Sequence, residues 1–93
     1  MQEDKELKQL IIQKVIEKKE FSSLNHTFIN KELSLYLLQN KKLFLKLKIK
    51  FDADKKRSLK SKELKLIIKD LRSKLRELFG IFYLPEFENA ESN

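Results

Sequence analysis

Three acidic residues, Asp52, Asp54 and Glu63, are spaced like positions 1, 3 and 12 of a calcium-binding loop, where carboxylate oxygens serve as ligands. The match ends there. Lys56 stands where a further ligand is needed, and Arg57 replaces the glycine that allows the sharp turn of such a loop. The surrounding lysines also repel a divalent cation. We therefore expect no metal ion here.

His26 stands beside Thr27 and close to Ser22 and Ser23, and a hydroxyl nucleophile with a neighbouring base needs residues of these types. Neither serine lies in a glycine-rich elbow, and the N-terminus of a helix accounts for all four polar residues. The chain has no cysteine, one histidine and no glycine-rich phosphate loop, which excludes a disulfide scaffold, a Cys-ligated zinc site and a site with several His ligands. We therefore predict no catalytic residue, no cofactor and no enzymatic activity in the chain as it stands.

A row of cations on the last expected helix is a stronger candidate for a functional site than the residues discussed above. Its members recur at i, i+3, i+7, i+10 and i+14, which confines them to an arc of roughly 80°. They are Lys62, Lys65, Lys69, Arg72 and Arg76. Such a row can follow nucleic-acid phosphates, whose neutralisation releases counterions, whereas base stacking is not indicated because no aromatic residue interleaves. A merely solvated helix face is one alternative; a membrane-binding face is another, disfavoured because the adjacent apolar stripe is needed for the core.

Three helices follow from apolar residues that recur every three or four positions, over about residues 4–19, 26–39 and 61–79. Ser61 is the expected N-cap of the last helix, and Gly80 its stop in the left-handed conformation. The apolar stripe of that helix comprises Leu64, Ile67, Ile68, Leu71, Leu75, Leu78 and Phe79.

The stretch 43–51, LFLKLKIKF, fits both a strand and a helix. We predict a helix because no second strand is found to pair with it. Residues 51–58 are expected to form an exposed charged loop. The predicted fold is therefore all-α, a small bundle of three to four helices over residues 1–80, with a short C-terminal tail or interdomain linker over 81–93.

Positive charge is concentrated in the second half of the chain. The 93 residues, enough for one domain, carry a net charge of +7. Residues 1–40 hold six basic and six acidic side chains, residues 41–76 hold fifteen and four, and residues 77–93 hold none and four. This distribution is typical of a surface for polyanions. Without a long apolar run or a signal-like N-terminus, we expect a cytoplasmic protein that does not bind membranes.

Over about residues 10–84 the chain resembles the N-terminal helical domain of archaeal 16S rRNA methyltransferases and of the related aminoglycoside-resistance 16S rRNA methyltransferases. The segments that carry the resemblance are VIEKKEFSSLNHTFINKELSLYLLQN and KSKELKLIIKDLRSKLRELFGIFYL. The matching positions are a turn at Lys18, Lys19, Glu20 and Phe21, and a helix end at Lys69, Arg72, Leu75, Arg76, Phe79 and Gly80.

The resemblance implies a domain that docks on ribosomal RNA in the small ribosomal subunit, ahead of a Rossmann-like domain that binds S-adenosylmethionine. The methyltransferase domain and its catalytic residues are missing from this chain, and the lysine-rich stretch 46–60 is longer than the family's usual connection. A fragment, a truncated product and a free-standing relative all fit. The function predicted is a non-catalytic RNA-binding module; the alternative is a protein-interaction or structural helical bundle.

Overall fold

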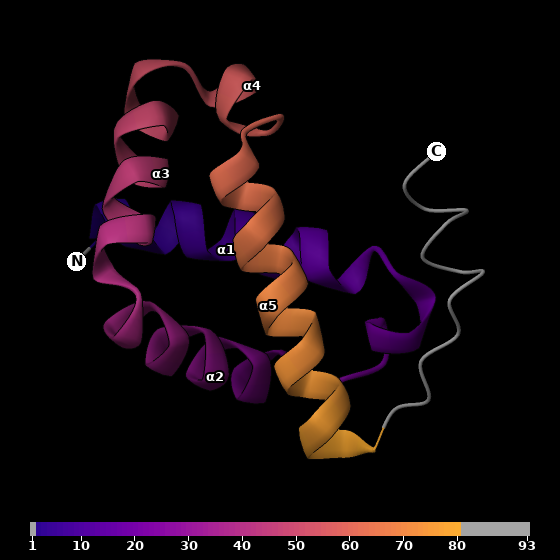
Figure 1. Cartoon of the computed structure of the whole chain (residues 1–93). Helices are drawn as coiled ribbons and strands as arrows, with labels where there is room; N and C mark the ends of the chain where they lie inside the picture. The colour runs from indigo at the N-terminus through magenta and orange to yellow at the C-terminus, as the bar shows by residue number, and fades with distance from the viewer. Residues whose placement is uncertain (1, 81–93) are drawn as a thin grey trace.

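The computed structural model describes residues 2–80, with side chains from residue 4 onward, and this part of the chain is helical and contains no strand, which confirms the all-α prediction. The elements are α1 (Gln2–Ile16), the 3-10 helix η1 (Lys19–Phe21), α2 (His26–Gln39), α3 (Lys41–Ala53), α4 (Lys55–Ser58) and α5 (Lys62–Phe79) (Figure 1). The expected tail, residues 81–93, lies outside the described residues.

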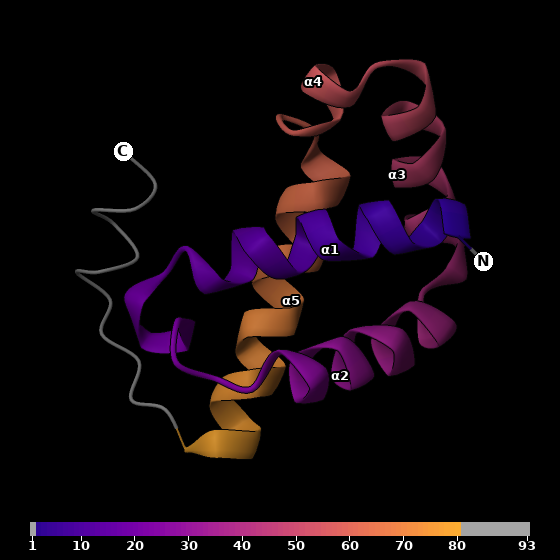
Figure 2. The ribbon, with the colours of Figure 1, turned by 180° about the vertical axis from the view of Figure 1, so that it is seen from behind.

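The helix α1 lies on one side of both α3 and α5. In Figure 1 it crosses behind both α3 and α5, and in the opposite view of Figure 2 it crosses in front of them. The helices α3 and α5 therefore lie on the same side of α1.

One apolar core joins the four long helices and η1. Its members recur at helical spacing, as the sequence predicts, and removing each large side chain from water contributes about 1.5–3 kcal/mol. The fully buried ones are Leu7, Ile11, Val15, Phe21, Ile29, Leu33, Leu47, Leu64, Ile67, Leu71 and Leu75.

The apolar stripe of α5 ends one turn earlier than predicted. Leu78 and Phe79 are 48% and 44% exposed, because the core does not extend to the last turn of the helix. Phe79 instead packs edge-to-face against Phe28 of α2, with ring centroids 4.9 Å apart.

The first helix is shorter than predicted and ends at Ile16 rather than near Lys19. Lys18 has an extended backbone (φ −80°, ψ 127°), and the turn η1 follows. This change of direction places Phe21 fully inside the core. Burial of one aromatic ring thus decides where the helical path of α1 is interrupted.

The ambiguous stretch 43–51 is helical, as predicted, and belongs to α3. Residues 51–58 do not form the predicted loop, because Phe51 lies in the last turn of α3 and α4 covers Lys55–Ser58; residues 52–57 are exposed, as predicted. Phe51 is 5% exposed and Ser58 is fully buried, so packing against the core orders the segment. The Asp54 carboxylate caps α4 by accepting from the Arg57 N–H at 3.2 Å.

Candidate nucleic-acid interface

The helix α5 is fixed at both ends by the caps that the sequence predicts. The Ser61 hydroxyl accepts from the Leu64 N–H at 3.2 Å. Gly80 adopts the left-handed conformation (φ 64°), and its N–H donates to the Arg76 carbonyl. These caps and the buried apolar stripe set the rotation of α5, and therefore which of its cations face solvent.

Three of the five predicted cations face solvent. Lys62, Lys65 and Lys69 are exposed, and none of the three forms an ion pair within the described part of the chain. Arg72 and Arg76 lie on the same flank of α5 but further along it, where α1 and η1 cover the helix. The predicted row is therefore divided into an exposed N-terminal half and a covered C-terminal half.

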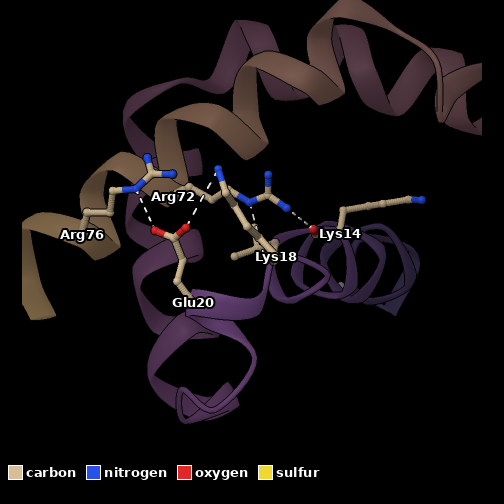
Figure 3. A network of polar contacts seen from close by, with 6 residues as sticks. Lys14, Lys18, Glu20, Arg72 and Arg76 are labelled. Carbon is tan, nitrogen blue, oxygen red and sulfur yellow. Dashed lines mark hydrogen bonds and ion pairs between the residues drawn. The ribbon is translucent and has the colours of Figure 1, made fainter. Parts of the chain in front are cut away.

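Arg72 caps the C-terminus of α1 from the side (Figure 3). Its guanidinium donates from Nε to the Val15 carbonyl at 3.3 Å and from Nη2 to the Lys14 carbonyl at 2.7 Å. The last carbonyls of a helix have no partner within the helix and carry its negative dipole end, so a cation is favoured there. Arg72 is 9% exposed, because its side chain lies against the end of α1 rather than in solvent.

Arg76 holds η1 against α5. Its Nε donates to the Glu20 carboxylate at 3.2 Å, and Lys18 approaches the same carboxylate at 4.0 Å (Figure 3). The Phe21 ring lies beneath both guanidiniums, 5.9 Å from Arg72 and 5.3 Å from Arg76. The turn that carries Phe21 is therefore part of a structural network.

Seven further exposed cations of the same charged block lie outside the row predicted on α5. Like the three exposed lysines of α5, they form no ion pair within the described residues. They are Lys41, Lys42, Lys46, Lys56, Arg57, Lys60 and Lys74. The charge count over 41–76 was the signal that could have found them, because it does not depend on one helical wheel.

Two other cations of the block are held by carboxylates at the start of α1. Lys48 lies 2.8 Å from Asp4 of α1, and Lys55 lies 2.5 Å from Glu6 of the same helix. The hydrogen bond from Lys48 holds the pKa of the Asp4 carboxyl below its usual value. The acidic start of α1 thus compensates the positive charge of two lysines of the block.

The two acidic side chains beside the exposed lysines of α5 are also engaged. Lys50 donates to Glu63 at 2.6 Å, and this hydrogen bond lowers the pKa of the Glu63 carboxyl. Asp70 accepts from the Tyr36 hydroxyl at 2.6 Å; burial, and then this bond, raise the pKa of Tyr36. Neither carboxylate projects freely among the lysines.

The other residues considered for chemistry have local structural contacts. Asn25, rather than either serine, caps α2, by accepting from the Phe28 N–H at 3.1 Å. Ser22 donates to the Lys19 carbonyl at 2.8 Å, and His26 is exposed in a groove between α1 and α2. Among the described residues, no three His, Asp or Glu side chains come together in a metal-binding arrangement.

Within residues 2–80, no helix is long and apolar enough to cross a membrane. Comparison of the chain with protein-family models, curated proteins and solved structures gives no match.

Proposed function

We propose that the chain is a non-catalytic RNA-binding module that contacts phosphates through the exposed cations of α3, α4 and α5. Supporting this is the accumulation, within residues 41–76, of ten exposed Lys and Arg side chains that form no ion pair in the described part of the chain. A compact domain gains nothing in stability from so many like charges, whereas each one that meets a phosphate releases a counterion.

Ribosomal RNA of the small subunit is the proposed target class. It follows from the resemblance to the docking domain of 16S rRNA methyltransferases, carried in part by Lys69, Arg72 and Arg76. The geometry revises how these residues contribute. Lys69 is available to a phosphate, whereas Arg72 and Arg76 hold α1 and η1 in place and act on binding through the fold.

The proposal is tested by co-sedimentation with purified small ribosomal subunits and by fluorescence anisotropy with a fragment of their RNA. We expect binding of the wild-type chain to weaken as salt rises, and Lys62→Gln/Lys65→Gln/Lys69→Gln to weaken it further. The matched control is Lys5→Gln/Lys8→Gln/Lys31→Gln, which removes the same charge from α1 and α2. Equal losses in both variants, or no binding at low salt, would contradict the proposal.

A protein-interaction bundle is the second candidate, and one feature of α3 favours it. Leu45 and Ile49 lie one turn apart on the outer face of this helix and are 56% and 61% exposed. A single aliphatic side chain with this much exposed surface is common on proteins. Several of them aligned on one face can mark a docking site. Absence of RNA binding in the experiment above would support a function in protein interaction instead.

A further inference from the structure

The outer face of α3 combines exposed aliphatic side chains with exposed lysines. We propose that this face binds the surface of an anionic lipid bilayer, as a peripheral contact that lies on the membrane and does not cross it. The proposal goes beyond RNA binding, which is tested on the lysines of α5, and it does not depend on it.

Contacts on both flanks of α3 fix which of its residues face outward. On one flank Lys48 binds Asp4 of α1 at 2.8 Å, and on the other Lys50 binds Glu63 of α5 at 2.6 Å. Between these flanks, on the inner side, lies the fully buried Leu47. Because each residue turns a helix by about 100°, the remaining positions lie on the opposite side, the outer face. Its large or charged members, all exposed, are Lys41, Lys42, Leu45, Lys46, Ile49 and Asp52.

Leu45 and Ile49 form the centre of the outer face. They are 56% and 61% exposed, and they adjoin because they lie one turn apart. The helical register places Lys41 on one side of this pair, and Lys42 and Lys46 on the other. None of these three lysines forms an ion pair within the described part of the chain. In Figures 1 and 2, α3 stands at one edge of the molecule, which leaves this face open.

The composition of the outer face distinguishes lipid from the other classes of occupant. RNA phosphates would bind the lysines but leave the aliphatic side chains in water. A second copy of the face would bring lysines against lysines, with Asp52 as the one carboxylate between them. Protein interfaces are enriched in arginine and aromatic residues and depleted in lysine, whereas the outer face has lysine and neither of the others. Aliphatic residues flanked by lysines are typical of a helix that lies on a membrane.

An anionic bilayer offers a partner to both kinds of side chain. Leu45 and Ile49 enter the boundary between the headgroups and the acyl chains, while the lysine stems extend so that their ammonium groups stay at the level of the lipid phosphates. The sequence-based objection to a membrane-binding face concerned the stripe of α5, which the core needs. It does not apply to Leu45 and Ile49, which lie outside the core. The pair is small, so the contact is weak, reversible and sensitive to salt.

A tryptophan placed on the outer face tests whether it enters lipid. The chain contains no tryptophan, so the fluorescence of Leu45→Trp reports on this face alone. We expect its emission to shift to the blue with vesicles of phosphatidylcholine and about 30% phosphatidylserine, and not with phosphatidylcholine alone. The matched control is Leu35→Trp, at a leucine of α2 that is 47% exposed in a groove also lined by Glu32 and Glu77. Its emission should not shift with either vesicle.

Co-sedimentation with the same anionic vesicles separates the aliphatic from the electrostatic contribution. Leu45→Gln/Ile49→Gln keeps the charge and should lower the partition coefficient at least about tenfold, because the aliphatic contact with lipid is lost. Lys41→Gln/Lys42→Gln/Lys46→Gln keeps the aliphatic pair and should lower the coefficient by about fivefold for each charge. Circular dichroism verifies that each variant remains helical.

The control for the aliphatic pair is Leu35→Gln/Leu78→Gln, which removes two leucines of similar exposure elsewhere and should leave partitioning nearly unchanged. An equal loss in this control and in Leu45→Gln/Ile49→Gln would overturn the assignment to α3. Absence of a blue shift in Leu45→Trp would overturn lipid binding and leave an acidic protein segment as the occupant. A dimer in sedimentation velocity that Leu45→Gln/Ile49→Gln dissociates would overturn it in favour of a second copy. None of these measurements contains RNA, so failure here is distinguishable from failure of the proposed function.

Discussion

The two halves of α5 carry cations on the same flank, yet they use them differently. In the N-terminal half, Lys62, Lys65 and Lys69 project into solvent. In the C-terminal half, Arg72 and Arg76 bind Lys14, Val15 and Glu20 of the covering segments. Periodicity places a residue on a flank, but the neighbouring element decides whether that flank is surface or interface.

The identity of the cations agrees with this division. A guanidinium donates in a fixed fork, so Arg72 satisfies two adjacent carbonyls at once. A lysine ammonium is strongly hydrated and is readily left in water. Within the predicted row, arginine stands where the flank of α5 is covered and lysine where it is open to solvent, a chemical difference that a count of positive charge conceals.

The largest loss of stability is expected from the apolar stripe that both halves share. Leu71 and Leu75 are fully buried, and replacing either by Ala removes core contacts and leaves a cavity. Each change should lower the free energy of unfolding by about 2–5 kcal/mol. Urea unfolding measures this, and a loss under about 1 kcal/mol would show that another surface of α5 provides its main packing.

Arg72→Gln should come next, with a loss of about 2–3 kcal/mol, because two carbonyls at the end of α1 lose their charged donor inside the protein. Arg72→Lys keeps the charge but cannot reach both carbonyls, so it should recover only part of the loss. Full recovery by lysine in urea unfolding would mean that charge alone, and not the fork, is what α1 requires.

How far the sequence predicts this molecule depends on the range of the interactions involved. The caps at Ser61 and Gly80 were predicted because a cap is made by residues three or four apart. Residues 51–58 were misassigned because α4 forms where Phe51 and Ser58 are buried by distant helices.

The candidate site follows the same rule. The positive block over 41–76 is visible in a charge count, and the exposed lysines of α5 follow from periodicity. The roles of Arg72 and Arg76 depend on residues more than fifty positions away, with which they hydrogen-bond across the fold. No local pattern carries that information.

The pair formed by Arg76 and Glu20 should contribute about 1 kcal/mol, since both side chains are largely but not wholly removed from solvent. A double-mutant cycle with Arg76→Gln and Glu20→Gln isolates this coupling. A coupling of zero would leave Phe21 alone as the group that holds η1 against α5.

Acid should weaken the fold through two carboxylates that are held by lysines of α3. The pKa values of Glu63 and Asp4 lie below their usual values of 4.5 and 3.8 in the folded protein, because Lys50 and Lys48 donate to them. A lowered carboxyl pKa stabilises the fold above its usual value, and this contribution is lost as pH falls through the folded value. The urea midpoint should therefore fall between about pH 6 and pH 3, and fall less in Lys50→Gln. An identical decrease in that variant would show that the Glu63 ion pair does not contribute.

The smallest effect on stability is expected from the exposed lysines themselves, and it is the sharpest test of the comparison. Lys62→Gln, Lys65→Gln and Lys69→Gln should each change the free energy of unfolding by about 0.5 kcal/mol or less, since an exposed helix charge without an ion pair gives up little when it is lost. The sign should tend towards stabilisation, because these cations repel one another and their neighbours over 41–76. RNA affinity should fall in the same variants, whereas Arg72→Gln should lower stability first and affinity only as the fold is lost. If a lysine variant instead unfolds as readily as Arg72→Gln, or if Arg72→Gln lowers the salt slope of RNA binding while still folded, the two halves of α5 do not differ in the way that their contacts indicate.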